Sequence, residues 1–455
     1  MAIESVNPST GERWRSYLPA RPDQIARSLQ QVQSASRSWA TVAFRERSAR
    51  LMAAADVLRR NRDEYARLMA REMGKPVTQG QGECDKCASV CEYYAENGAR
   101  LLAPELVKTE AARSLVAFEP IGVVLAVMPW NFPFWQVFRC AAPTLMAGNG
   151  LVLKHASNVP GCALAIEQVF REAGFPDGLM TSLLIDAKQV PALVSHPVIQ
   201  AVSLTGSVSA GRAVAAEAGR CLKKTVLELG GSDPYVVLED GDLEQAATLC
   251  VKSRLINSGQ SCIAAKRFIV VESVRQGFEE LFVAKLKSER VGDPLDAQTT
   301  VGPLAREDLR RDLHDQVQRS LAQGAKLLAG GEIPTGPGWF YPPTVLSDVR
   351  TGMAACDEET FGPVAAIISA RDEEDAIGIA NRSSFGLGSA VFTRDRARGE
   401  RIARTRLQAG NCFVNDYVRS DPRLPYGGIK DSGYGRELSG FGLREFVNIK
   451  TVVVN

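Results

Sequence analysis

The spacing of apolar residues predicts helices in the first part of the chain. Between residues 23 and 75, apolar side chains recur every three or four positions, as at Leu51, Ala54, Ala55 and Leu58. This spacing places them on one face of an α-helix. Gly74 and Pro76 then give a stop signal, so we expect the helical region to end there.

From residue 115 the pattern changes to short apolar runs separated by amphipathic stretches. We expect strands at 115–118, 123–127, 150–154, 201–204 and 225–228. Helices are expected at 162–173 and 208–219. Strands that alternate with helices are typical of a parallel sheet covered on both faces.

A second alternating series runs from residue 235 to about 415. It includes the expected strands 235–238 and 267–271, with a helix over 242–257 between them. The fold class predicted from the pattern is therefore α/β, with two such units in tandem. The chain closes with an apolar strand at 451–454, which needs an edge strand as partner, another subunit being one candidate.

Composition and charge narrow the function classes. The chain has 455 residues, of which 45% are hydrophobic and 23% charged, with a net charge of +2. Such a balance provides no broad electrostatic field for nucleic acid or an anionic membrane, and we expect neither as a partner. Residues 1–15 show no apolar signal core, and the longest apolar run, at 123–130, is too short to span a bilayer. We therefore expect a cytoplasmic protein.

Cysteines occur at helical spacing in one place, Cys84, Cys87 and Cys91. A zinc site is one interpretation, but a second ligand pair at suitable spacing is missing. Small apolar cysteines on a buried helix face are the interpretation we favour. We expect no bound metal.

The first motif with chemical potential is the run Pro-Trp-Asn-Phe-Pro that follows an apolar strand. Its central residue, Asn131, carries an amide that suits the stabilisation of an oxyanion. A turn asparagine that caps the helix after Pro133 explains the residue equally well.

A second motif, Glu-Leu-Gly-Gly, ends another apolar strand. Glu228 stands where open α/β sheets place ligands, at the carboxyl end of a strand. A carboxylate in a partly apolar site has a raised pKa and suits general-base catalysis. The alternative is a strand-end glutamate that faces solvent.

A third motif, Gly-Gln-Ser-Cys, follows a helix and presents Cys262 on a loop. An unperturbed thiol is mostly protonated at neutral pH and needs a base or fixed dipoles. The chain has only 3 histidines and none is an obvious partner. This argues against a papain-like hydrolase and favours a cysteine assisted by a carboxylate.

Two further segments follow apolar strands of the first unit, 154–157 and 205–207. Gly206 at a strand-to-helix turn lets backbone amides approach a pyrophosphate, and the helix N-terminus favours its charge. The G-x-G-x-x-G fingerprint is absent, so this feature supports nucleotide binding only in part.

In order, these motifs resemble the aldehyde dehydrogenase superfamily over essentially the whole chain. Glu359 opens a fifth matching run, Glu-Thr-Phe-Gly-Pro. The sequence is most similar to the bacterial succinate-semialdehyde dehydrogenase branch. The resemblance implies a Rossmann-like cofactor domain (1–104 and 126–230), a catalytic domain (231–425) and a small β oligomerisation element (105–125 and 440–455). It also implies a homodimer or homotetramer.

The resemblance further implies a mechanism. The Cys262 thiolate attacks the aldehyde, Asn131 and the Cys262 amide hold the oxyanion, and hydride passes to the nicotinamide. Glu228 then activates the water that hydrolyses the thioester. The cofactor-binding residues implied by the family are Trp130, Lys154, Ser157, Gly206, Ser207, Leu229, Glu359 and Phe361.

Two departures from the family pattern matter. Ala264 stands where many succinate-semialdehyde dehydrogenases have a second cysteine, so a redox disulfide is not expected. Ser157 stands where NAD-preferring relatives often have a glutamate that would repel a 2′-phosphate. We therefore expect NADP to be accepted and preferred over NAD. The alternative is that Ser157 is permissive and a neighbouring loop determines the cofactor preference.

The expected substrate contacts are Trp135, Arg139 and Ser420. Trp135 and Arg139 share a face of the helix expected after Pro133. An arginine at this position can bind a distal carboxylate through two parallel hydrogen bonds. The alternative is an arginine paired with an acid at a subunit interface. The expected substrate is a small aldehyde with a distal carboxylate, succinate semialdehyde. Glutarate semialdehyde, another aldehyde, or a non-catalytic binding role are the alternatives.

Overall fold

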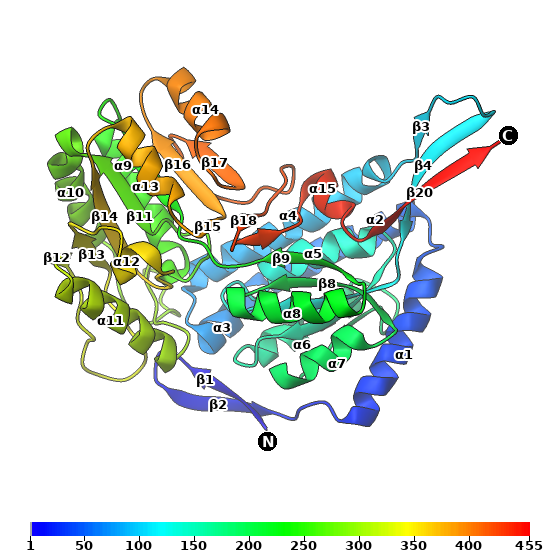
Figure 1. Cartoon of the computed structure of the whole chain (residues 1–455). Coiled ribbons are helices and arrows are strands. Elements are labelled where there is room, and N and C mark those ends of the chain that lie inside the picture. Colours follow the sequence, from blue (N-terminus) through cyan, green and yellow to red (C-terminus); the bar gives the residue numbers. More distant parts are fainter. Residues whose placement is uncertain (1) are drawn as a thin grey trace.

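The computed structural model describes residues 2–455. It contains two large α/β units, each built on one sheet, and a small sheet that projects from the body (Figure 1). The first sheet has six strands in the order β19-β9-β8-β5-β6-β7, all parallel except β19. Its strands are β5 (Val123–Met128), β6 (Gly150–His155), β7 (Met180–Ser182), β8 (Ile199–Thr205), β9 (Lys224–Glu228) and β19 (Gly433–Tyr434). Four of the expected apolar runs, 123–127, 150–154, 201–204 and 225–228, form the centre of this sheet, as parallel strands covered on both faces require. The expected run 115–118 lies instead in the small projecting sheet.

Two groups of helices pack around the first sheet, one from the segments between its strands and one from the N-terminal part of the chain. They are α5 (Trp135–Met146), α6 (Pro160–Glu172), α7 (Val190–Ser195), α8 (Val208–Arg220) and the single turn η1 (Ala187–Gln189). The expected helical region at the N-terminus forms α1 (Pro22–Trp39), α2 (Phe44–Arg60) and α3 (Arg62–Met73), and it is followed by α4 (Val77–Leu101). Cys84, Cys87 and Cys91 lie on α4 and are fully buried in the hydrophobic core, as the favoured interpretation requires.

The second sheet has seven strands in the order β12-β13-β14-β11-β10-β16-β17. They are β10 (Pro234–Val237), β11 (Arg267–Val271), β12 (Lys326–Ala329), β13 (Thr344–Ser347), β14 (Val364–Ala370), β16 (Gly388–Phe392) and β17 (Asn411–Val414). The helices around it are α9 (Leu243–Leu255), η2 (Ile256–Gly259), α10 (Glu272–Lys287), α11 (Glu307–Ala322), α12 (Ala354–Asp357), α13 (Glu373–Asn381) and α14 (Arg396–Thr405). The two tandem α/β units expected from the pattern are thus present.

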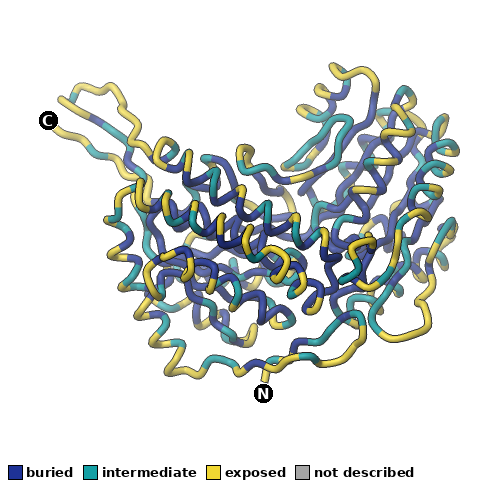
Figure 2. Tube along the Cα trace, turned by 180° about the vertical axis from the view of Figure 1, so that it is seen from behind, coloured by how far each residue is buried: buried dark blue, intermediate teal, exposed yellow. Residues whose placement is uncertain are grey.

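The small sheet combines β3 (Glu105–Val107), β4 (Arg113–Pro120) and the C-terminal β20 (Val447–Val454) in the order β20-β4-β3. It extends away from both units and is largely exposed (Figure 2). The terminal strand therefore has a partner inside its own chain, β4, with Val452 opposite Leu115. The remaining elements are β1 (Ile3–Asn7), β2 (Glu12–Tyr17), β15 (Phe385–Gly386), β18 (Ile429–Lys430) and α15 (Ser439–Leu443).

The three sheets divide the chain near the boundaries expected for the domains, which stay a prediction. One feature departs from simple order along the chain. After β17 the chain returns from the second unit to the first, where β19 pairs with β9 and Tyr426 pairs with Glu437. This return brings residues 420–437 beside the first sheet, and they contribute to the site described next. Within residues 2–455, no helix is both long and apolar enough to cross a membrane.

Candidate active site

Cys262 lies in a loop whose backbone is tightly constrained. The preceding turn η2 holds Asn257 and Ser258 at positive φ, 52° and 56°, followed by Gly259 at 78°. A Cβ on Gly259 would stand 2.3 Å from the backbone of Gly362, so only glycine fits. The strained turn is overdetermined by its surroundings, as is common where a reactive side chain must be aimed.

The Lys266 ammonium fixes the other side of this loop. Its Nζ donates to the carbonyl oxygens of Cys262 at 2.9 Å and of Ser261 and Ala264 at 3.1 Å. The Cys262 thiol lies 3.8 Å from the hydroxyl of Tyr426. Burial raises the pKa of Cys262 to about 11, while the charges of Arg139 and Lys266 oppose that rise. The thiol therefore needs further activation to become a thiolate at neutral pH.

Asn131 contacts this loop and does not cap a helix. Its Nδ2 donates to the carbonyl of Gln260 at 3.1 Å, and its own carbonyl accepts from Asn257 at 2.7 Å. The first amides of α5, of Phe134 and Trp135, instead donate to the Glu83 carboxylate at 2.9 Å. The helix-capping alternative for Asn131 is therefore wrong, and its amide stands next to the nucleophile loop.

Glu228 ends β9 and is only 2% exposed, so the solvent-facing alternative is also wrong. Neither carboxylate oxygen has a hydrogen-bond partner among the described residues. Burial raises the pKa of Glu228, against the pull of Arg139 and with a contribution from Glu437. A carboxyl group with a raised pKa and free lone pairs has the properties of a general base for water.

Arg139 lies between these groups. Its side chain forms a buried ion pair with Glu437, donates to Thr205 at 3.3 Å and lies over the Tyr426 ring at 4.6 Å. Its charge acts on both Cys262 and Glu228. The alternative that Arg139 pairs with an acid is thus correct in part, but the acid belongs to the interior of the same chain.

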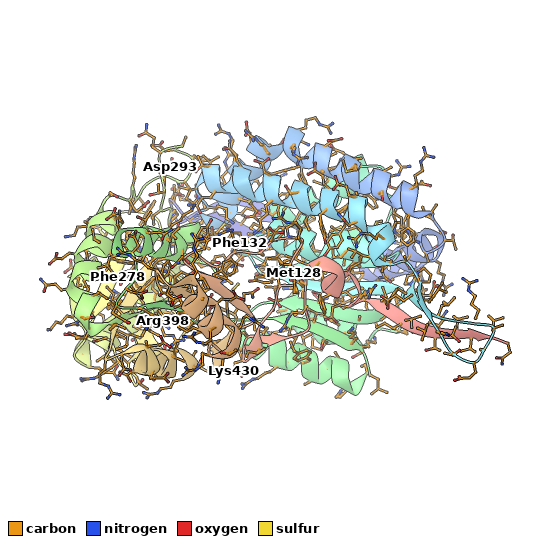
Figure 3. All side chains as sticks on the ribbon, turned by 90° about the horizontal axis from the view of Figure 1, so that it is seen from above. Met128, Phe132, Phe278, Asp293, Arg398 and Lys430 are labelled. Atoms are coloured by element: carbon orange, nitrogen blue, oxygen red, sulfur yellow. The ribbon has the colours of Figure 1, made fainter. Side chains whose placement is uncertain are left out.

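A pocket of about 960 Å³ opens beside Cys262, the candidate nucleophile, between α4 and α5 of the first unit and α9 of the second. Cys262, Trp135, Arg139 and Ser420 all line it, so the three expected substrate residues meet at one cavity with the nucleophile. Phe132, which also lines it, lies near the middle of the molecule in Figure 3. Asn131 and Glu228 do not line this pocket.

The expected cofactor residues follow the carboxyl ends of the first sheet. Lys154 is the last residue but one of β6 and forms no ion pair within residues 2–455, and burial lowers its pKa against the influence of Asp186. Ser157 is exposed three positions later. Gly206 precedes α8, whose first turn is capped by Ser207 accepting from the Ala210 amide at 3.3 Å. An unpaired cation, a hydroxyl and a helix N-terminus fit a dinucleotide phosphate.

The remaining cofactor candidates lie nearer to the nucleophile. Glu359 accepts from the Gly231 amide at 3.0 Å and stands 3.7 Å from Lys266. A Cβ on Gly230 would lie 2.5 Å from Glu359, so the two glycines make room for this carboxylate. Trp130 and Phe361 meet edge to face at 5.7 Å. Leu229 packs under α8, where a Cβ on Gly211 would lie 2.6 Å from it.

Fold and site together match the class of dehydrogenases that use a nicotinamide cofactor. The profile of the aldehyde dehydrogenase family matches residues 1–452, and the chain belongs to this family.

Individual relatives within the family show which of its members the chain is similar to. The chain is 48% identical to the succinate semialdehyde dehydrogenase [NAD(P)+] Sad of Escherichia coli K12, over 98% of this chain and 97% of that protein. It is 47% identical to a probable succinate-semialdehyde dehydrogenase [NADP(+)] of Synechocystis over 99% of each chain. Among solved structures, the succinic semialdehyde dehydrogenase of Streptococcus pyogenes in complex with NADP+ covers all of both chains with a TM-score of 0.97 and 38% identity.

Several functional residues escape sequence reasoning. Tyr426, Glu437 and Lys266 surround the nucleophile and its neighbours, and Lys86 enters the pocket from α4. Tyr426 and Lys266 lie in two further stretches that are similar to the family, 425–430 and 262–268, but that similarity gave neither residue a role. The sequence gives no signal for Lys86, because a lysine that enters a pocket from an amphipathic helix cannot be distinguished by pattern from a lysine that faces solvent.

Proposed function

We propose that this enzyme oxidises succinate semialdehyde to succinate, with NADP preferred over NAD. The observation that carries the proposal is the single pocket in which the nucleophile Cys262 meets the cationic and hydroxyl groups of Arg139 and Ser420. Relatives named as succinate-semialdehyde dehydrogenases at 46–48% identity support it.

In this proposal each catalytic group acts at a stated atom. The sulfur of Cys262 adds to the aldehyde carbon, and the Asn131 amide with the backbone amide of Cys262 stabilises the oxyanion. The bound nicotinamide supplies the hydride acceptor. Glu228 takes a proton from the water that attacks the acyl–cysteine, which releases the acid and returns the thiol. The unpartnered carboxylate of Glu228 supports that assignment.

The proposed cofactor contacts explain the expected preference. Lys154 offers an unpaired cation beside Ser157, a small neutral residue, and residues 154–158 contain no carboxylate. This chemistry suits an additional phosphate on the adenosine ribose. Trp130, Phe361 and Glu359 would border the nicotinamide end, whereas Gly206, Ser207 and Leu229 belong to the end that receives the pyrophosphate.

We also propose a homodimer or homotetramer in the cytoplasm. The projecting sheet exposes apolar side chains, among them Leu106 at 73% and Ile449 at 61%, and such a surface is typical of an association site. All ten cysteines are free, which suits a reducing compartment. Sedimentation velocity tests the oligomer, and a monomer at micromolar concentration would contradict it.

A panel of aldehydes assayed with both cofactors tests the central proposal. Initial rates are measured for succinate semialdehyde, glutarate semialdehyde and butanal, each with NAD and with NADP. We expect the highest kcat/KM for succinate semialdehyde with NADP. A higher value for butanal would refute the carboxylate specificity, and a higher value for glutarate semialdehyde would move the assignment to that substrate.

A further inference from the structure

Lys86 is a charged residue in the pocket that the mechanism above does not use. It lies on α4, one helical turn after Glu83, and is partly buried in the pocket wall. Its Nζ donates to the hydroxyl of Ser420 at 2.7 Å and lies 4.2 Å from the centre of the Trp135 ring. It therefore contacts two of the three residues expected to hold the substrate.

The other basic side chains of the pocket differ from Lys86 in their partners. Arg139 is paired with Glu437, Lys285 with Glu244, and Arg419 with Asp416. Each of these charges is thus compensated inside the protein. Lys252, like Lys86, has no ion pair among the described residues, but it is exposed, so solvent screens its charge, and it lies over the Tyr417 ring at 4.9 Å.

The acids nearest to Lys86 have other partners. The Glu83 carboxylate pairs with Lys75 and accepts two amides of α5. Asp421 pairs with Arg423 at 2.6 Å. In the part of the chain that the structure describes, Lys86 has no ion pair within 4 Å. A partly buried ammonium group without a carboxylate partner is costly, and a bound carboxylate would compensate it.

A purely structural role explains less. A lysine stem that only packs on Trp135 needs no ammonium group pointing into a cavity, because its charged end would extend to solvent. Here the charged end is held inside the pocket by a hydroxyl. Arg139 lies near enough for its charge to act on both Lys86 and Cys262, and all three residues line the same pocket.

We propose that the ammonium group of Lys86 and the hydroxyl of Ser420 together bind the distal carboxylate of the substrate, and that Lys86 determines the preference for carboxylated over neutral aldehydes. The inference rests on the proposed function, since it assigns the charge that function requires. Lys86 is the partly buried cation of the site whose charge no carboxylate of the described residues neutralises. Arg139, committed to Glu437, adds positive potential from deeper in the pocket.

The test compares kcat/KM for succinate semialdehyde with that for butanal, a neutral aldehyde of the same carbon number. Lys86→Met keeps the stem over Trp135 and removes the charge. We expect the ratio of the two kcat/KM values to fall about tenfold or more, because a charge-assisted hydrogen bond to the carboxylate is lost. Lys86→Arg keeps the charge and should retain a larger ratio than Lys86→Met.

Lys252→Met is the matched control, since it removes one positive charge at the exposed rim of the same pocket. Its ratio should change less than about twofold. If Lys86→Met lowers the ratio no more than Lys252→Met does, the assignment of Lys86 is wrong while the proposed function stands. If the wild-type enzyme shows no preference for succinate semialdehyde over butanal, the proposed function itself fails.

A second variant keeps the test decisive if Lys86→Met does not fold. Ser420→Ala removes only a hydroxyl and is expected to lower the same ratio at least threefold, as the loss of one hydrogen bond of roughly 1 kcal/mol would. An unchanged ratio in a folded Ser420→Ala enzyme overturns the inference.

Discussion

Replacing Arg139 by methionine tests how far the buried ion pair with Glu437 supports the active site. The two side chains are 2% and 5% exposed, so the substitution leaves the Glu437 carboxylate in the interior without its cation. Loss of one partner of a buried pair lowers the free energy of unfolding by about 3–5 kcal/mol. Removing the cation also lets the pKa of Glu437, which burial already raises against the pull of Arg139, rise further.

That free energy converts into a melting temperature through the size of the chain. An unfolding entropy of about 2.1 cal/mol/K per residue gives roughly 1 kcal/mol/K for 455 residues. The melting temperature should therefore fall by about 3–5 °C, measured by differential scanning fluorimetry at neutral pH. Arg139→Met combined with Glu437→Gln should recover at least half of the loss, because the glutamine carries no charge and can still meet Ser203.

Arg423→Met is the matched control. Arg423 also pairs with an acid, Asp421, but its side chain is 75% exposed, and such surface pairs contribute about 0–1 kcal/mol. Its melting temperature should stay within about 1 °C of the wild type. A change equally small in Arg139→Met, or no recovery in the double variant, would refute the reasoning that the ion pair with Glu437 stabilises this site.

Four further outcomes are expected. Cys262→Ala should abolish NADPH formation while cofactor binding, followed by protein fluorescence, persists; substantial residual turnover would exclude Cys262 as nucleophile. Glu228→Gln should release about one NADPH per active site in a rapid burst and then turn over roughly 10²–10⁴-fold more slowly; a steady rate without a burst would contradict the role of Glu228 in thioester hydrolysis. Ser157→Glu should shift the ratio of catalytic efficiencies toward NAD, and an unchanged ratio means that another loop decides. Burial and the charge of Arg139 lower the pKa of Lys86 to about 8; since only its ammonium form attracts a carboxylate, the preference for succinate semialdehyde over butanal should fall as the pH rises through that value. Titration of Cys262 or Glu228 affects both aldehydes and cancels in this ratio, and a ratio as flat as that of Lys86→Arg would refute the role of the ammonium.

The positions of the strands along the chain could be predicted from the sequence, because they depend on local pattern. Strand β11 has the expected bounds, and β6 extends only one residue beyond them. Such runs are apolar throughout, since a parallel strand buried on both faces admits little else. Cys262, Asn131 and Glu228 were found for a related reason, because each stands at the end of an element and carries a short motif.

The pairings inside the site could not be predicted, because they join segments far apart in the chain. Glu437 reaches Arg139 only because the chain returns to the first sheet after β17. The periodicity of apolar residues does not predict that the chain returns to the first sheet. The apolar pattern of the terminal strand showed only that a partner was needed, and it was the family resemblance that grouped this strand with residues 105–125, which contain β4.

The start of α5 shows how these unpredicted contacts create the site. The helix has no capping side chain of its own, and its first two free amides donate to Glu83 of α4. Glu83 is in turn held by the buried Lys75. Since Trp135 and Arg139 lie on the first turns of α5, the position of α4 determines where they stand relative to Cys262. The same helix carries Lys86 into the pocket one turn later. Helix α4 therefore supports the expected substrate residues and also carries Lys86, a partly buried charge without an ion pair within residues 2–455, and a substitution that moved this helix would change positioning and specificity together.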